Sequence, residues 1–177
     1  RHEVIQTMYT FVRGHRTISL LYKAVIAHSS HSLAPLKLSW EDALGRVFHD
    51  KEWLRVLAYP HEVSRNAQFQ SIQFNILHRA YLTPWVLGNM FPGVDTLRAR
   101  CRAPLANFWH MFWRCPAITQ YWQDVLNVLL AVTVWDLPNT IEACLLGVFT
   151  RPKQFRTIWR FIDLSLVLAR RAITIKW

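Results

Sequence analysis

The sequence predicts an all-α protein, an irregular multi-helix bundle with a degenerate CCHC-like turn. Apolar residues recur every three or four positions along most of the chain, and prolines and hydroxyl residues mark helix starts. No stretch alternates apolar and polar residues over the length of a strand between turn signals. The 177 residues are 52% apolar and 14% aromatic, which is enough for a hydrophobic core.

The N-terminal part carries two helical repeats of apolar residues, at 4–12 and 18–27. A polar run follows at 28–32, and we expect a linker there. Because no cysteine lies near His28 and His31, we favour a solvated loop over metal binding for these two histidines.

Two short helices are expected next. Ser39 followed by Glu41 and Asp42 indicates a helix start, since a hydroxyl cap and early acids satisfy the free N–H groups of a first turn. A second helix is expected to begin at Asp50 and to end at Pro60.

The segment 64–82 has the clearest amphipathic pattern in the chain. Its apolar stripe, which we expect to face the core, is formed by Phe69, Ile72, Ile76 and Ala80. Polar residues such as Gln73 are expected to point away from that stripe. Thr83 and Pro84 then open a short helix through Met90.

Proline again marks the start of the remaining helices, which we expect at 116–135, 138–146 and 153–177. The last of them has an apolar stripe that we expect to face the core, formed by Ile158, Phe161, Leu168, Ala172 and Ile175.

Charge and cysteine content limit the function classes. The 21 Lys and Arg against 11 Asp and Glu give a net charge of +10, which predicts a polyanionic partner such as nucleic acid or an acidic membrane surface. No apolar run is long enough to cross a bilayer, so we expect a soluble chain.

Three cysteines, an odd number, favour reduced thiols and a nuclear or cytoplasmic location. The sequence begins at Arg1 without a signal-peptide pattern, so we expect part of a longer protein.

The stretch 98–116 concentrates the residues that can bind a metal. Cys101, His110 and Cys115 follow the spacing Cys-x8-His-x4-Cys, the second half of a zinc knuckle. A complete knuckle would need a first cysteine at position 98, where this chain has Arg98. The sequence therefore offers three of the four ligands.

Two interpretations of these three residues stay open. They hold zinc, with Asp95 as the nearest oxygen donor for a fourth position, or they are two small buried thiols and a packed histidine. We favour the second interpretation, because structural zinc takes four N or S donors. A core without metal would then come from the aromatic cluster Phe108, Trp109, Phe112 and Trp113.

Basic residues form two candidate nucleic-acid-binding surfaces. The first alternates along the Cys/His stretch at a spacing suited to successive phosphates, and consists of Arg98, Arg100 and Arg102. The second follows the last expected helix and consists of Lys153, Arg156, Arg160, Arg170 and Arg171. Trp109 and Trp113 would stack unpaired bases if exposed, at about 1–3 kcal/mol per contact, although tryptophans at helical spacing are more often core residues.

The sequence lacks the residues of a polymerase or a hydrolase. The only adjacent acids, Glu41 and Asp42, are explained by helix capping. There is no Tyr-x-Asp-Asp run, no Gly-x-Ser-x-Gly elbow and no glycine-rich phosphate loop. We therefore expect no enzymatic activity.

Several blocks of the sequence resemble the C-terminal part of the second open reading frame protein of LINE-type non-LTR retrotransposons, most closely the branch of fish and amphibians. These blocks are WLRVLAYPHEVSRNAQFQSIQF, FNILHRAYLTP, HMFWRCP, YWQDVL, ACLLGVF and LARRAITIKW. The resemblance covers residues 36–177.

The resemblance implies a fold and a function. The full family protein is an endonuclease and reverse transcriptase, and its C-terminal region is a helical module with a CCHC zinc knuckle that grips template RNA or target DNA. Residues 36–177 would be that module, 1–35 a helical linker region from the upstream polymerase, and Cys101, His110 and Cys115 the second, third and fourth zinc ligands. We therefore expect a non-catalytic nucleic-acid-binding module. The alternatives are a helical protein-interaction module and a decayed remnant without selected activity.

Overall fold

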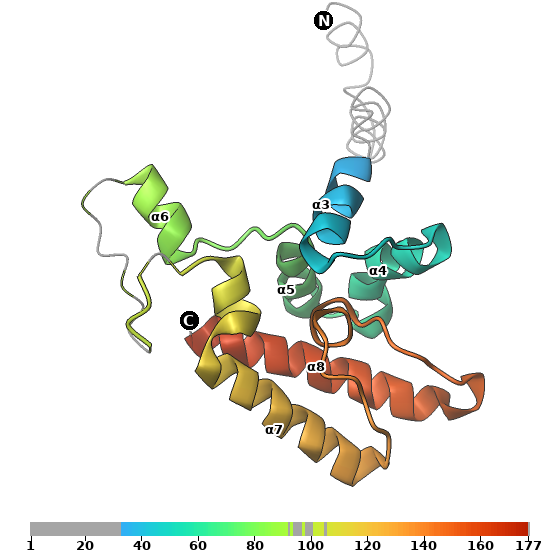
Figure 1. The fold of residues 1–177 in the computed structure, drawn as a ribbon. Coiled ribbons are helices and arrows are strands. Elements are labelled where there is room, and N and C mark those ends of the chain that lie inside the picture. Colours follow the sequence, from blue (N-terminus) through green and yellow to red (C-terminus); the bar gives the residue numbers. More distant parts are fainter. Residues whose placement is uncertain (1–32, 92, 94–96, 98–100, 105, 177) are drawn as a thin grey trace, which may run out of the picture. The chain divides into compact units, whose positions relative to one another are not determined.

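The computed structural model describes residues 33–91, 93, 97, 101–104 and 106–176 (Figure 1). They form helices and connecting segments without any strand, so the predicted all-α fold class is confirmed for this part of the chain. Contacts divide the chain into two units, Arg1–Trp40 and Glu41–Trp177. The helices predicted before residue 28, together with His28 and His31, lie outside the described residues.

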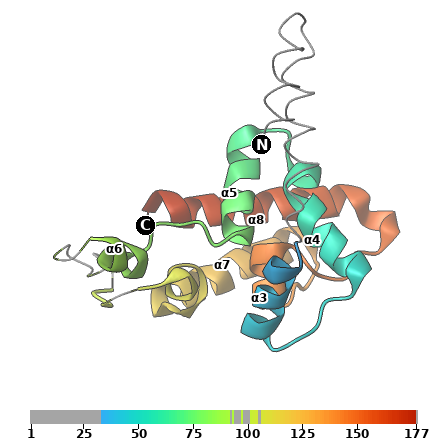
Figure 2. The same cartoon turned by 90° about the horizontal axis from the view of Figure 1, so that it is seen from above.

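The described helices include two short π-helices, η1 and η2, and one 3-10 turn, η3. Their bounds are α3 (Ala34–Leu44), α4 (Asp50–Val63), α5 (Ala67–Leu77), α6 (Pro84–Met90), η1 (His110–Arg114), α7 (Pro116–Thr133), η2 (Glu142–Leu146), η3 (Lys153–Phe155) and α8 (Arg156–Lys176). Within the second unit, α8 contacts α4, α5, α7 and both π-helices. Figure 1 shows α5 on one side of α8 and α7 on the other, and Figure 2, seen from above, shows α5 passing across α8. No helix among the described residues is long and apolar enough to span a bilayer.

The starts and ends of two helices differ from the prediction. Helix α3 begins at Ala34, because Pro35 fits a first helical turn, and Glu41 therefore lies late in the helix. The Glu41 carboxylate accepts a hydrogen bond from the backbone N–H of Phe48 (2.7 Å) instead of capping a first turn. Helix α4 continues through Pro60 to Val63.

Helix α5 is shorter than the predicted segment 64–82. It starts at the Asn66 cap, whose side chain accepts from the backbone N–H of Gln68 (2.8 Å). It ends after Leu77, because Arg79 adopts a left-handed backbone conformation with φ +52°. Ala80, predicted as the last residue of the apolar stripe, therefore lies outside the helix.

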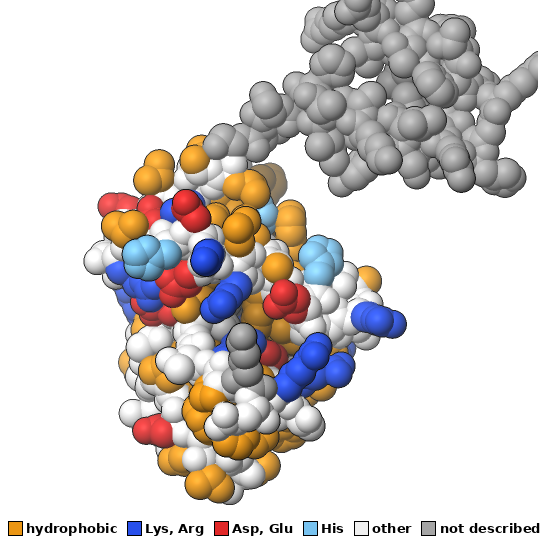
Figure 3. All heavy atoms as spheres, turned by 90° about the vertical axis from the view of Figure 1, so that its right-hand side faces the viewer, with side chains coloured by type: hydrophobic (Ala, Val, Ile, Leu, Met, Phe, Trp, Pro, Cys, Tyr) orange, Lys and Arg blue, Asp and Glu red, His pale blue; other side chains and the backbone are white. Residues whose placement is uncertain are grey.

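The core face of α8 is opposite to the predicted one. The residues that α8 buries are Trp159, Ile162, Asp163, Leu166, Val167, Ala169, Arg170 and Ile173. Phe161, Leu168 and Ile175, which we expected in the core, are exposed. Both sides of this helix carry apolar residues, so periodicity alone could not choose between them. Figure 3 shows exposed hydrophobic side chains gathered in patches next to basic ones on one face of the molecule.

Buried polar side chains connect α5 and α8 to η2. Gln73, predicted to point away from the core, is 2% exposed, and its amide donates to the Leu145 carbonyl (2.8 Å). Arg170 is fully buried and donates from Nε to the Cys144 carbonyl and from Nη1 to Gln73 Oε1, both at 2.6 Å. Backbone groups that the wide turn of a π-helix leaves without helical partners are thus bonded by side chains from other helices.

A second buried cluster surrounds Asp163. Its carboxylate accepts from the Tyr59 hydroxyl (3.0 Å) and from both terminal nitrogens of Arg151 (2.7 and 2.9 Å). Burial raises the pKa of Asp163 against the opposing effect of Arg151, and burial raises the pKa of Tyr59 to about 12. Burial likewise raises the pKa of the nearby Cys144 thiol to about 12, so Cys144 is a structural thiol rather than a reactive one.

Candidate metal centre

A π-helical turn brings His110 and Cys115 to the same side of the chain. In an ordinary α-helix two residues five positions apart point roughly 140° away from each other. Here the backbone N–H of Cys115 donates to the His110 carbonyl (3.3 Å), the i to i+5 bond of a π-helix, and this wider turn reduces the angle between the two side chains.

Neighbouring side chains hold this turn at both ends. At its start the Asn107 side chain accepts from the backbone N–H of His110 (3.0 Å). At its end the indole N–H of Trp122 donates to the Phe112 carbonyl (2.9 Å), and the Thr119 hydroxyl lies 3.0 Å from the Trp113 carbonyl. Trp122 is fully buried, so the start of α7 fixes the backbone next to Cys115.

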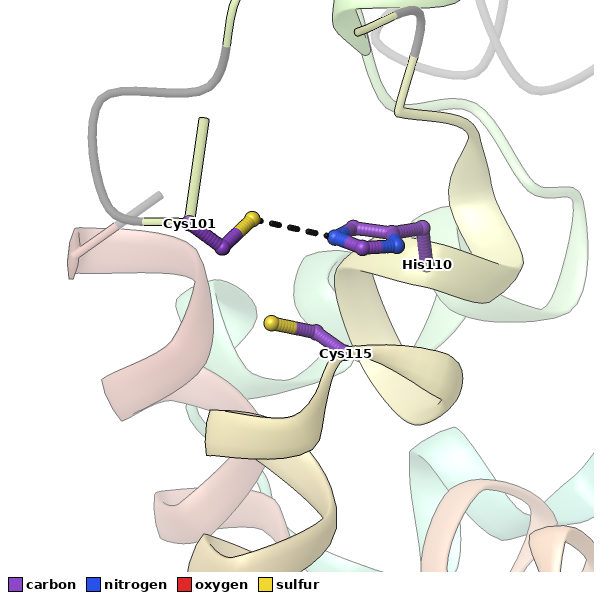
Figure 4. A group of neighbouring side chains, drawn as sticks. All are labelled: Cys101, His110 and Cys115. Atoms are coloured by element: carbon purple, nitrogen blue, oxygen red, sulfur yellow. Dashed lines mark hydrogen bonds between the residues drawn. The ribbon is translucent and has the colours of Figure 1, made fainter. Parts of the chain in front are cut away.

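Cys101 completes a group of three metal-binding side chains. The ligand atoms of Cys101, His110 and Cys115 all lie within 4.8 Å of one another, and Cys101 Sγ is 3.1 Å from His110 Nε2 (Figure 4). Cys115 is fully buried, whereas Cys101 and His110 are half-buried. The interpretation of both cysteines as buried hydrophobes therefore holds for Cys115 but not for Cys101.

The three donors suit zinc in type and in distance. Two thiolates and an imidazole are its preferred soft ligands, and tetrahedral zinc places such donor atoms about 3.5–3.8 Å apart. The observed group needs only small side-chain movements to reach that spacing. Arg98, which replaces the missing cysteine ligand, and Asp95, the alternative oxygen donor, lie outside the described residues. No other group of metal-binding side chains occurs in the described part of the chain.

Two exposed arginines directly adjoin the thiols of this group. Arg102 follows Cys101, and Arg114 precedes Cys115. Both are exposed, and neither forms an ion pair with any described acid. Arg114 was not among the predicted binding residues, although its position beside Cys115 was the signal that could have identified it. Arg100 and Arg98 lie outside the described residues.

The second predicted basic surface is only partly present. Arg156 and Arg160 are exposed at the start of α8. Arg171 is half-buried with its guanidinium 5.5 Å from the Phe69 ring centroid. Arg170 was wrongly placed on this surface: it is fully buried, because it bonds the backbone of η2. The side chain of Lys153 lies outside the described part.

The two candidate stacking residues are half-buried. The guanidinium of Arg79 lies 4.6 Å from the Trp109 ring centroid and thus covers part of that ring. Trp113 packs against Trp122 at a centroid distance of 6.4 Å. Each ring is partly engaged within the protein, so base stacking by either remains a prediction.

Comparison with known proteins adds no family assignment. No protein-family model matches the chain, and no curated protein sequence matches it significantly. The resemblance to the retrotransposon proteins therefore stays a prediction.

Proposed function

We propose that the chain is a non-catalytic nucleic-acid-binding module whose contact surface is the Cys/His turn. The observation that carries this proposal is the pairing of each thiol in the three-residue group with an adjacent exposed arginine. The Sγ atoms of Cys101 and Cys115 lie within 4.8 Å of each other, so the segments that carry the exposed Arg102 and Arg114 meet at the Cys/His turn. Two exposed cations that pair with no acid in the described part of the chain suit the phosphates of one nucleic-acid strand.

A zinc ion would hold this surface in shape. Bound by Cys101, His110 and Cys115, it would tie the loop that carries Arg102 to the turn that carries Arg114. The net charge of +10 supports the choice of a polyanionic partner, and the resemblance to retrotransposon proteins favours RNA template or target DNA. The parent protein would then be a reverse transcriptase.

Metal content tests the zinc site. The purified protein is expected to hold one zinc per chain by elemental analysis. His110→Ala and Cys115→Ser are each expected to lower the zinc affinity more than about tenfold, because each removes one of three donors. Cys144→Ser is the matched control, since it removes a buried thiol outside the group.

Arg98→Cys would supply a fourth donor and is expected to tighten zinc binding. Zinc-free parent protein beside an Arg98→Cys variant with one zinc would instead identify a broken knuckle.

Salt-dependent RNA binding tests the contact surface. Fluorescence anisotropy with a single-stranded RNA is expected to show binding at low salt that weakens as salt rises. The Arg102→Ala, Arg114→Ala double variant is expected to bind about tenfold more weakly and to reduce the log–log salt slope by about 1.4, two phosphate contacts at 0.7 each.

The control for that experiment removes the same charge elsewhere. Arg55 and Arg65 are exposed on and beside α4, away from the Cys/His turn in sequence. The Arg55→Ala, Arg65→Ala variant is expected to retain nearly all of the affinity. Equal losses in the two double variants would show that only net charge matters, and absence of binding at low salt would refute the proposed function.

A further inference from the structure

Helix α8 carries an apolar face on each of two opposite sides, and only one of them is covered by the described protein. On the uncovered side, exposed apolar residues recur at intervals of three, four and seven positions, which places them on one stripe of the helix. Its members, with their exposed fractions, are Phe161 (48%), Leu164 (39%), Leu168 (46%) and Ile175 (64%). A helix that is apolar on both sides normally has protein on both sides.

The stripe has the length of a helix-docking site. From residue 161 to residue 175 it extends about 21 Å at 1.5 Å per residue. Positions 161, 164, 168 and 175 also fit the a and d positions of a heptad, the arrangement by which one helix packs along another. The remaining d position is occupied by Arg171, which borders the stripe on the side of Arg160.

Helix α7 widens the stripe. The Tyr121 hydroxyl, near the start of α7, donates to the Ala169 carbonyl near the end of α8 (3.1 Å). Trp135, just after α7, packs edge-on against Trp159 at the start of α8, with 4.5 Å between the ring centroids. The two helices therefore run antiparallel. Helical spacing puts a pair of valines on the same side of α7 as Tyr121, toward α8. These are Val128 (62% exposed) and Val132 (63% exposed). Val128 and Val132 and the α8 stripe are exposed apolar residues of two neighbouring helices, and we name this set the α7–α8 face.

The charge along the α8 edge of this face has one sign, whereas on α7 the exposed Asp124 lies one helical turn before Val128. Arg160 and Arg171 lie along one edge of the α8 stripe, where Arg160 is exposed and Arg171 half-buried. The single acid of α8, Asp163, is on the opposite side, buried and paired with Arg151. The edge of the face is therefore positive and has no acidic counterpart on α8.

We propose that the α7–α8 face binds an amphipathic helix of a partner protein, with apolar residues at heptad spacing and Asp or Glu along the edge that meets Arg160 and Arg171. Helix-in-groove recognition of this kind uses apolar anchors for affinity and edge charges for orientation. A second copy of this chain suits the face poorly, because it brings the same arginines along its α8 edge and a net charge of +10. The proposal goes beyond nucleic-acid binding and does not depend on it.

Two synthetic helical peptides test the proposal. Both carry Leu at a and d positions over three heptads; one has Glu along one edge, and the other has Lys at the same positions. By fluorescence anisotropy the Glu peptide is expected to bind at least tenfold more tightly than the Lys peptide. Arg160→Glu with Arg171→Glu is expected to reverse that preference. Equal binding of the two peptides, or no binding of either, would overturn the proposal.

Two point variants locate the binding surface. Leu168→Glu places a charge in the middle of the stripe and is expected to weaken binding of the Glu peptide at least tenfold. Leu130→Glu makes the same change at an exposed leucine (40%) on the far side of α7 and is expected to leave binding unchanged. Similar losses in both variants would place the site elsewhere.

Other occupants give different results. A dimer in light scattering that Leu168→Glu dissociates would identify a second copy instead. Cosedimentation with phosphatidylserine vesicles that Leu168→Glu abolishes, without peptide binding, would identify a membrane surface; either outcome overturns the proposal. RNA affinity is expected to stay unchanged in Leu168→Glu, so peptide binding and RNA binding can be refuted independently of each other.

Discussion

Arg170→Met is expected to lower the free energy of unfolding by about 2–5 kcal/mol, the largest loss for any single arginine among the described residues. The side chain is fully buried and supplies the hydrogen bonds to the Cys144 carbonyl and to Gln73 Oε1, both at 2.6 Å. Methionine fills a similar volume but donates nothing, so two buried acceptors lose their partner. Each such acceptor costs about 1–3 kcal/mol when no water replaces the donor.

Arg171→Met is the matched control, because it removes the same charge one residue further on. Arg171 is half-buried with its guanidinium 5.5 Å from the Phe69 ring centroid, so a loss below about 1 kcal/mol is expected. Urea denaturation of both variants measures the difference. Equal losses in the two single variants would contradict the buried role of Arg170.

The same arginine shows where sequence reasoning reached its limit. Arg170 and Arg171 are adjacent and identical in type, and both were predicted on a basic surface. Only tertiary structure separates them, because the partner of Arg170 on α5, Gln73, lies 97 residues earlier in the chain. The amphipathic pattern placed Gln73 outside the core for the same reason: periodicity contains no information on which polar residues will meet a partner inside.

The fold class and the existence of most helices were predictable because their signals are local. Proline at the first position of α6 and of α7, and the Thr83 cap, lie where the sequence placed them. Helix ends were less predictable. Leu77 ends α5 because Arg79 takes a left-handed conformation that arginine does not favour, and no residue type announces it.

The candidate site was predictable from spacing, but its geometry was not. The pattern of Cys101, His110 and Cys115 identified the three ligands, whereas the π-helical turn that aligns the last two has no sequence signature of its own. Both π-helices of the described chain depend on distant side chains for their carbonyls, Trp122 in η1 and Arg170 in η2. A π-helix is therefore stabilised here by tertiary packing, which the local sequence does not predict.

Gly147→Ala is expected to destabilise the protein by about 2–5 kcal/mol, for two reasons that add. Gly147 has φ +71°, a conformation that costs an L-residue about 1–2 kcal/mol. A Cβ at this position would also overlap Cζ of the Tyr59 ring, closer than any allowed contact. Tyr59 is 3% exposed, so protein surrounds its ring. Its hydroxyl also donates to Asp163, and the ring cannot move away without losing that hydrogen bond.

Gly45→Ala separates the two contributions. Gly45 has nearly the same backbone conformation, φ +64°, but a Cβ there meets no atom within 4 Å. It is therefore expected to lose only the conformational part, about 1–2 kcal/mol, in the same urea denaturation experiment. The difference between the variants measures the clash with Tyr59, and equal losses would show that no clash occurs.

The ionisation of Tyr59 provides an independent readout of that clash. Burial raises the pKa of this phenol to about 12, so the folded state keeps a proton that the unfolded state releases above pH 10. Stability is therefore expected to fall as pH rises from 10 toward 12, and less steeply in Gly147→Ala, where displacement of the ring toward solvent lowers its pKa. Gly45→Ala should keep the parent's alkaline dependence, because its Cβ meets no part of Tyr59. An unchanged dependence in Gly147→Ala would mean that the backbone, rather than the tyrosine ring, absorbs the added methyl group.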